Sequence, residues 1–117
     1  MNVNPEILSA LSSLTIPVSW LEYKGKATEY VVFNDSLNTA DLYGDDGDIV
    51  DRVIVQIHHY TKNDPYDRLK EIRNLLREAD FTILDTLTTR DTDAGTTTGY
   101  IHSIIRIQKV GMSEDFI

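Results

Sequence analysis

One stretch of the chain, residues 48–79, most constrains the possible fold. It opens with DIVDRVIVQIHHY, continues through TKN, and ends with DPYDRLKEIRNLLREA. The first run alternates apolar and polar residues, as a half-buried strand does, and the last repeats apolar residues at helical spacing. Since a strand and the helix that follows it must each bury one face, the remaining segments are expected to flank this unit.

The strand is predicted over residues 49–60, where Val53, Val55 and Ile57 share one face. This apolar row should face the core, and the opposite, mixed row should be half exposed. Asp64 and Pro65 then restart the chain as a helix, because Asp is a good N-cap and proline is tolerated in the first turn. The buried stripe of this helix is predicted to contain Leu69, Ile72, Leu75, Leu76 and Ala79.

The flanking segments predict one more helix and four more strands. The helix is expected over residues 5–14, with Asn4 as its N-cap, and Ile16-Pro17 ends it. Its apolar face is predicted to hold Ile7, Leu8, Leu11 and Leu14. The strands are expected over residues 18–23, 29–34, 81–89 and 100–110. One face of the strand over residues 81–89 is predicted to hold Phe81, Ile83, Asp85 and Leu87. The core face of the strand over residues 100–110 is predicted to hold Ile101, Ile105 and Ile107.

The segments between these elements are polar. Residues 36–48 are rich in Asp, Gly, Asn and Ser, which predicts a loop or a loose hairpin arm. Residues 90–99 predict a polar turn, and residues 111–117 a loose tail. Short links between strands favour antiparallel pairing. The expected fold class is therefore α+β, a mostly antiparallel sheet with two helices packed on one face and an extended acidic arm.

Composition bounds the function further. The length of 117 residues fits a single domain, and the absence of cysteine excludes disulfides and thiolate metal sites. With a net charge of −8 and scattered basic residues, direct nucleic-acid binding is not expected, since that needs clustered Lys and Arg. The first residues lack the basic and apolar regions of a signal peptide, and no apolar run approaches the roughly 20 residues that span a membrane.

Two candidate metal sites can be weighed from the residues. His58 and His59 point to opposite faces of a regular strand, so a site would need His102 to join one of them. A plain role on the sheet surface is the favoured interpretation. The acidic segment from Asp41 resembles a calcium loop in composition, but its sixth position is Asp46 instead of glycine, and its twelfth is not glutamate. No metal or cofactor is therefore expected.

Catalytic motifs give no support for an enzyme. The chain has no G-x-S-x-G, H-E-x-x-H or phosphate-binding glycine-rich pattern. Aromatic residues, in contrast, exceed what one small sheet needs inside, and aromatic side chains are enriched at protein interfaces. Oligomerisation is accordingly expected. The aromatic residues concerned are Trp20, Tyr23, Tyr30, Tyr43 and Tyr60.

Several motifs together resemble the tail terminator, or tail completion, proteins of long-tailed bacteriophages and related prophages. An arm with a Y-x-D-D-like element, here residues 43–46, precedes a strand of the type V-Q-V-x-x-(Y/W)-(T/S)-K, here residues 55–62. A helix of the type L-x-x-E-I-R-x-x-L-x-x-A-G-F follows at residues 69–81, with Asp80 where glycine is usual. Tyr100, His102 and Arg106 match the closing strand, and the resemblance covers about residues 5–110.

This resemblance implies a non-enzymatic virion protein. Members of the group form a ring, typically a hexamer, that caps the tail tube and joins it to the head connector protein, with DNA passing through. It implies a location in the virion tail or neck, and in the host cytoplasm during assembly. The candidate interface residues are Trp20, Tyr23, Leu42, Tyr43, Asp45, Asp46, Asp48 and Tyr60. The alternatives are another phage neck component or, in a different class, a small acidic metal- or ligand-binding enzyme.

Overall fold

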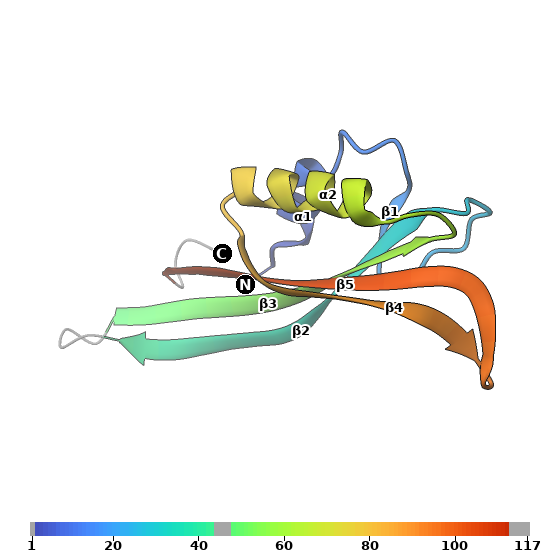
Figure 1. Ribbon diagram of the computed structural model, residues 1–117. Coiled ribbons are helices and arrows are strands. Elements are labelled where there is room, and N and C mark those ends of the chain that lie inside the picture. Colours follow the sequence, from blue (N-terminus) through green and yellow to red (C-terminus); the bar gives the residue numbers. More distant parts are fainter. Residues whose placement is uncertain (1, 44–47, 113–117) are drawn as a thin grey trace.

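The computed structural model describes residues 2–43 and 48–112, which form a five-stranded sheet with two helices on one face (Figure 1). The helices are α1 (Asn4–Ala10) and α2 (Tyr66–Glu78). The strands are β1 (Val18–Trp20), β2 (Tyr30–Tyr43), β3 (Asp48–Thr61), β4 (Thr82–Asp93) and β5 (Thr96–Met112), in the spatial order β1-β2-β3-β5-β4. The predicted α+β class, with both helices on the same face, is confirmed.

The sheet is mixed because its first strand runs parallel to its neighbour. β2 with β3, β3 with β5 and β4 with β5 are antiparallel, whereas β1 pairs in parallel with β2 and places Trp20 beside Phe33. β1 is also shorter than the predicted strand over residues 18–23. Leu21 takes a left-handed backbone conformation (φ 68°), and its N–H donates to the Phe33 carbonyl at 2.9 Å. This turn leads the chain away from the sheet edge.

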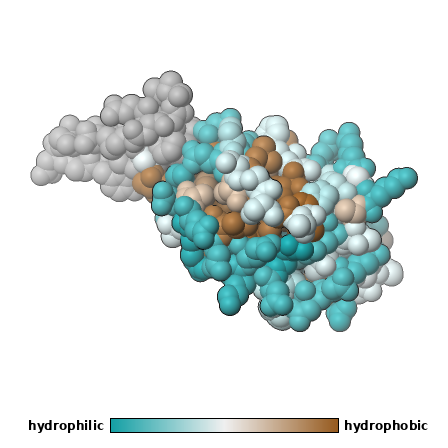
Figure 2. Space-filling model, turned by 90° about the horizontal axis from the view of Figure 1, so that it is seen from above, coloured by the Kyte–Doolittle hydropathy of each residue, from teal (hydrophilic) through white to brown (hydrophobic). Residues whose placement is uncertain are grey.

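The hydrophobic core lies between the helices and the sheet. Val53, Val55 and Ile57 of β3 are fully buried, as the alternation of this strand predicts. On β5, Ile105 and Ile107 are fully buried, while Ile101 is half-buried and Ser103 fully buried. From the helices, the core receives Val3, Ile7, Leu11, Leu69, Ile72 and Leu76. Figure 2 views the helix side and shows apolar residues gathered in the middle of this face, within a hydrophilic rim.

Local chemistry sets both ends of α2. The Tyr66 N–H donates to Asp64 Oδ1 at 2.9 Å, so Asp64 satisfies a free donor although the helix begins after Pro65. At the other end, Asp80 adopts φ 67°. The N–H groups of Asp80 and Phe81 donate to the carbonyls of Arg77 and Leu76 at 3.0 Å, which is the Schellman arrangement. Asp therefore takes the left-handed position that glycine usually fills.

The first helix is shorter than predicted. It ends at Ala10, and its N-cap is Val3 instead of Asn4. The Asn4 N–H donates to Asn2 Oδ1 at 3.0 Å, so the neighbouring asparagine supplies the acceptor. Leu8, predicted on the buried face, is exposed. In so short a helix, the buried row consists of Val3, Ile7 and Leu11.

All four of the middle and late strands are longer than the sequence predicts, and β3 gains one residue at each end. β2 passes the expected break at residues 34–36 through a bulge between Asp35 and Leu37, and pairs with β3 out to Tyr43 opposite Asp48. The acidic arm is therefore a regular hairpin up to those residues. The prediction of a polar turn over residues 90–99 is also wrong. Ala94 and Gly95 alone form the turn, both with positive φ, and β4 and β5 pair from Asp93 and Thr96 onward.

A bulge also changes the faces of β4. Between Ile83 and Asp85 the register shifts by one residue, so Ile83 packs against the core whereas Asp85 and Leu87 lie on the opposite face. The prediction that these residues share one face is wrong beyond Ile83. At the chain end, β5 continues to Met112, so residues 111–112 belong to the sheet, and residues 113–117 lie outside the described part.

The position of Phe33 in the core predicts how much the free energy of unfolding falls when its ring is removed. Replacing Phe33, which is fully buried, by alanine should reduce the free energy of unfolding by about 3–5 kcal/mol, through lost burial and a residual cavity. Leu87→Ala removes a side chain that is 60% exposed and should cost less than about 1 kcal/mol. Urea unfolding followed by circular dichroism measures both, and equal losses would contradict this placement of the core.

Candidate functional site

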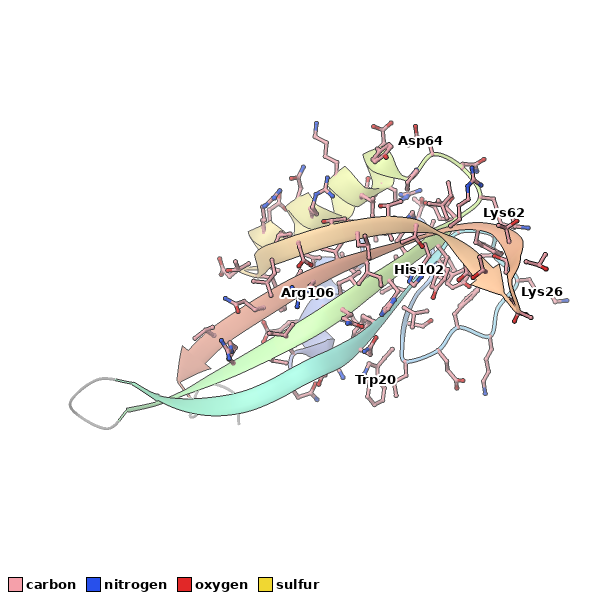
Figure 3. All side chains as sticks on the ribbon, turned by 60° about the horizontal axis from the view of Figure 1, so that its bottom comes forward. Trp20, Lys26, Lys62, Asp64, His102 and Arg106 are labelled. Carbon is pink, nitrogen blue, oxygen red and sulfur yellow. The ribbon has the colours of Figure 1, made fainter. Side chains whose placement is uncertain are left out.

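The sheet face opposite the helices is the candidate functional surface. Pairing brings Tyr30 beside Tyr60 and Tyr60 beside His102, so alternate residues of β2, β3 and β5 form rows across the strands. No described helix covers this face, and His102 and Arg106 extend from it in Figure 3. Exposed surfaces rich in apolar and aromatic groups commonly mark interaction sites. We call it the uncovered face below.

Aromatic rings form a continuous row across one end of the uncovered face. Tyr23 stacks on Tyr30 with ring centroids 4.4 Å apart, and Tyr30 stacks on Tyr60 at 5.0 Å. Tyr60 in turn stacks on His102 at 4.3 Å. Tyr100 packs edge-on against Tyr30 and Tyr60 at 6.1 and 6.4 Å. Since stacking uses the ring faces, ring edges and hydroxyl groups are the parts of the row that remain for other contacts.

A histidine pair continues this row. His58 Nδ1 and His102 Nε2 are 2.8 Å apart, a hydrogen bond in which one nitrogen donates and the other accepts. His58 Nε2 lies 3.2 Å from Gln56 Oε1, which can only accept. Burial lowers the pKa of both histidines, and for His58 the neighbouring His102 lowers it further. For His102, Asp91 opposes the shift without reversing it. The pair is therefore neutral at neutral pH.

The structure joins two of the three histidines that the sequence singled out. His58 and His102 come together, while His59 points into the core and is 0% exposed. Among the described residues, no group of three or more metal-ligating side chains converges. A zinc site needs at least three protein ligands at bonding distance. The two histidines contribute a shared hydrogen bond instead.

A shallow groove of about 420 Å³ lies farther along the uncovered face, lined by Gln56, Leu87, Ile104 and Arg106. The Arg106 guanidinium holds Asp85 through a bifurcated hydrogen bond from Nε to both carboxylate oxygens at 2.9 and 3.1 Å, and through a second bond from Nη2 to Oδ2 at 2.5 Å. This hydrogen bonding lowers the pKa of the Asp85 carboxyl. The groove therefore combines apolar side chains with a fixed ion pair, a mixture typical of protein interfaces.

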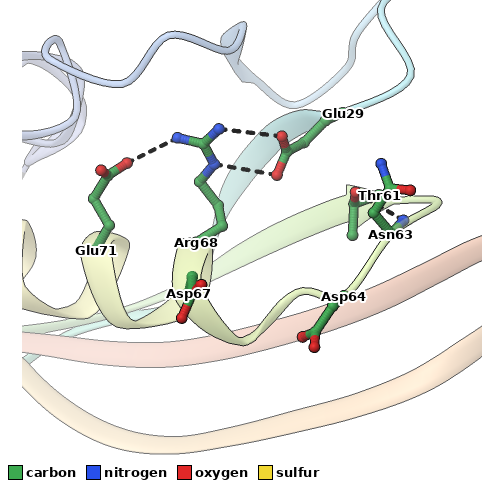
Figure 4. A pocket seen from close by; sticks show the side chains of 7 residues that line it. All are labelled: Glu29, Thr61, Asn63, Asp64, Asp67, Arg68 and Glu71. Carbon is green, nitrogen blue, oxygen red and sulfur yellow. Dashed lines mark hydrogen bonds and ion pairs between the residues drawn. The ribbon is translucent and has the colours of Figure 1, made fainter.

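A second polar cluster lies on the helix side and ties three segments together (Figure 4). Glu29 Oε2 lies 2.8 Å from His59 Nε2, and Arg68 of α2 donates to both Glu29 oxygens at 3.2 and 3.3 Å. Arg68 also donates to Glu71 at 2.9 Å. Glu29, Arg68 and Glu71 border a pocket of about 250 Å³ that Asp64 and Asp67 also line. The cluster connects the segment before β2 with β3 and α2.

The electrostatics of this cluster indicate a structural role. Partial burial alone would raise the pKa of Glu29, but hydrogen bonds from Arg68 and His59 lower it overall, so the carboxylate stays charged. Burial lowers the pKa of His59 and outweighs the hydrogen bond to Glu29, which acts to raise it. A fully buried imidazole cannot reach a substrate. We therefore assign the cluster to fixing the fold.

The predicted interface residues are distributed over both ends of the sheet. Tyr23 and Tyr60 belong to the aromatic row, and Trp20 is 52% exposed at the end of β1. Leu42, Tyr43 and Asp48 lie on β2 and β3 at the hairpin end, and Asp45 and Asp46 lie outside the described residues. Tyr100 and the histidine pair were not predicted to belong to one row with these tyrosines. The alternation of β3 and β5 contains the signal, but only the register between the strands brings them together.

The chain matches no protein-family model and no curated protein sequence. No helix in the described part of the chain has the length and apolar character needed to cross a membrane. The candidate site is consequently defined by its own geometry.

The lowered histidine pKa values predict acid sensitivity. Because the folded state binds protons at His58, His59 and His102 less readily than the unfolded chain, stability should fall as the pH drops below about 6.5. Glu29, whose pKa is also lowered, should add a further loss below about pH 4.3. Urea unfolding at a series of pH values measures this. A His58→Gln/His102→Gln variant should lose less stability than the parent between pH 7 and 5, and an identical loss would contradict it.

The cluster around Glu29 predicts a second stability effect. Glu29→Ala leaves the buried His59 and the half-buried Arg68 without their acceptor, so unfolding should become easier by about 1–3 kcal/mol. Glu71→Gln removes only an exposed partner of Arg68 and should cost less than about 1 kcal/mol. Thermal and urea unfolding of both variants test this difference. A loss at Glu71 as large as that at Glu29 would contradict the assignment.

Proposed function

We propose that this protein is a non-enzymatic structural component of a phage tail, of the tail terminator or head-tail joining class, and that it acts as a ring. The uncovered face carries this proposal, because it supplies a large, aromatic-rich surface that a monomer leaves in contact with water. The resemblance of residues 5–110 to that class gives the proposal its biological context.

The shape of the molecule supports assembly through its two ends. Its extents are 53 × 31 × 24 Å, and the hairpin of β2 and β3 continues beyond the part of the sheet that the helices cover (Figure 1). One end therefore presents a projecting hairpin and the other the aromatic row. Different surfaces at opposite ends favour heterologous contacts, which close into a ring when the rotation between copies permits.

The sheet edge formed by β4 is less suited to such a contact. None of the described strands pairs with its outer side, but bulges after Ile83 and after Arg90 interrupt its regular backbone. Bulges and charged side chains such as Asp85 and Arg90 are devices that discourage strand addition. We therefore place the contacts between copies on the uncovered face and the hairpin, and not on this edge.

The acidic balance suits a channel for DNA. Each copy carries a net charge of −8, and a ring of copies accumulates negative potential around its bore. Such a potential repels phosphate, so DNA would pass without being held. The tail tube protein and the head connector protein are the partners this function requires. A closely related alternative is another neck component built on a similar sheet.

A rival function of a different class is a metal- or ligand-binding enzyme, for which His58 and His102 are the candidate residues because they lie together on the uncovered face. Elemental analysis of the purified protein distinguishes a metal-binding enzyme from the proposed structural protein. Stoichiometric transition metal that is lost in a His58→Gln/His102→Gln variant would support the rival. Metal below about one atom per ten chains would support the structural proposal.

The structural proposal predicts a particle phenotype. Phage lysates made without this protein should contain tails of irregular or excessive length, or heads and tails that are not joined, because the tube would lack its terminating ring. Negative-stain electron microscopy measures this, and supplying the protein from a plasmid should restore joined particles. Normal particles in its absence, together with its absence from purified virions, would overturn the proposal.

A further inference from the structure

A groove of about 370 Å³ lies beside the aromatic row on the uncovered face, and we call it the tyrosine groove. Its lining mixes aromatic, apolar and polar side chains, among them Leu21, Tyr23, Tyr30, Val32, Asn34 and Tyr60. Concave sites with an apolar lining and a few polar groups are typical binding sites. The chemistry around the groove therefore indicates what kind of molecule it would bind.

Leu21 lines this groove in a backbone conformation that leucine rarely adopts. Its φ of 68° lies in the left-handed region, and its N–H is fixed to the Phe33 carbonyl at 2.9 Å. The Leu21 side chain is nevertheless 57% exposed, and the neighbouring Trp20 is 52% exposed. Strained residues persist where the surrounding structure holds them, and they cluster at binding sites. Leu21 is thus a candidate apolar contact for a ligand of the groove.

The segment that follows Leu21 is fixed around the ring of Tyr23. This ring stacks on Tyr30 at 4.4 Å, and its hydroxyl accepts a hydrogen bond from the Ala27 N–H at 2.8 Å. A Cβ on Gly25 would collide with the same ring, so glycine allows the backbone to pass against it. The backbone on both sides of Lys26 is therefore anchored next to the groove.

Two lysines at this end of the sheet lack a carboxylate partner. Lys26 and Lys62 are exposed, and neither forms an ion pair within the part of the chain that the structure describes. Lys62 Nζ lies 4.9 Å from the centre of the Tyr100 ring, and Figure 3 shows both lysines at the same end. Burial raises the pKa of Tyr30 and of Tyr60, so both phenols keep their protons. Ammonium groups and neutral phenols both donate hydrogen bonds to carboxylates.

The carboxylates near the groove are already engaged. Glu22 Oε1 lies 3.4 Å from Lys24 Nζ. Asp91 Oδ2 accepts a hydrogen bond from the Thr98 hydroxyl at 3.1 Å. Both unpaired lysines consequently remain available to a negatively charged ligand.

The ring faces of the aromatic row are occupied as well. Tyr30 is stacked between Tyr23 and Tyr60 at 4.4 and 5.0 Å. Tyr60 is stacked between Tyr30 and His102, which lies 4.3 Å away. Single-stranded nucleic acids bind through free aromatic faces and a groove of cations that follows the phosphates. Covered rings and two lysines offer neither, so a polypeptide with carboxylate side chains fits this site better.

We propose that the tyrosine groove binds an extended acidic segment of a neighbouring tail protein, with its carboxylates on Lys26 and Lys62 and an apolar side chain against Leu21. This contact deepens the joining function proposed above and rests on it, because the tail tube and head connector proteins are the neighbours of the ring. Alternate side chains of an extended segment share one side, so acidic and apolar groups can both reach the groove. Because the tyrosines are already stacked, little side-chain freedom is lost on binding.

The net charge of −8 does not prevent this contact. At about 0.15 M salt, charges farther than roughly 8 Å from the ligand are largely screened. The two unpaired lysines therefore dominate the electrostatics of a segment that lies in the groove.

A peptide probe tests the proposal with the full-length protein. The probe is a fluorescein-labelled peptide of about ten residues that alternates glutamate with leucine and tyrosine, and fluorescence anisotropy follows its binding. At about 0.15 M salt the parent should bind it with a Kd of about 0.1 mM or lower. Lys26→Glu/Lys62→Glu should weaken binding at least about tenfold, and so should replacing every glutamate of the probe by glutamine.

Lys70→Glu/Arg73→Glu is the matched control, because it changes the net charge equally on α2, on the other side of the sheet. It should change the Kd less than about twofold. An equal loss in this control would overturn the proposal, as would a parent that binds no peptide at about 1 mM. Tighter binding of a labelled single-stranded DNA at the same lysines would also overturn it. So would self-association of the parent that Lys26→Glu/Lys62→Glu abolishes in sedimentation equilibrium, since a second copy would then occupy the groove.

Leu21→Gly separates binding from folding. Glycine adopts a positive φ without strain, so the thermal midpoint of unfolding should stay the same or rise. The affinity for the probe should nevertheless fall at least about threefold, because the exposed apolar side chain is lost. An unchanged affinity would overturn the role of Leu21 in the contact.

These outcomes are separable from the test of the joining function. In lysates that lack the protein, Lys26→Glu/Lys62→Glu supplied from a plasmid should give at least about tenfold fewer joined particles than the parent. Full restoration by this variant would overturn the contact and leave the function standing. Normal particles without any copy of the protein would overturn the function, whatever the peptide measurements show.

Discussion

The arrangement of this molecule depends on the alternation of its central strand. Val53, Val55, Ile57 and His59 of β3 are completely buried, while the side chains between them face the other way. Long strands pair with β3 on both sides, so this alternation is imposed on β2 and β5 through the register. One face of the sheet consequently collects the core and both helices. The other collects tyrosines, histidines and polar side chains, and it remains open.

Much of the fold could be predicted because it follows from local patterns. The apolar rows of β3 and β5, the stripe of α2 and the left-handed position at Asp80 are each encoded within a few residues. The ends of the strands were harder to predict, because polar segments such as residues 36–43 and 90–93 have the composition of loops. They extend as strands because pairing with a long neighbour satisfies their backbone groups, and bulges absorb the mismatches.

The candidate surface could be predicted only in part, for a related reason. Tyr23 and Tyr60 can be recognised as surplus aromatic residues, but the row also needs Tyr100 and His102 from β5. Their meeting depends on which residue of β3 faces which residue of β5, and no local pattern gives that register. The parallel pairing of β1 was missed for the same reason, because it depends on how residues 21–29 cross the end of the sheet.

The buried cluster of Glu29, His59 and Arg68 has a consequence for misfolding. A slip of β3 by one residue that puts Tyr60 in the place of His59 would send His59 to the uncovered face. Glu29 and Arg68 would then lose the imidazole that now lies 2.8 Å from the carboxylate, and a charged pair would remain in a partly dry site. The buried His59 imidazole thus discriminates against this decoy sheet, although its strand composition is the same.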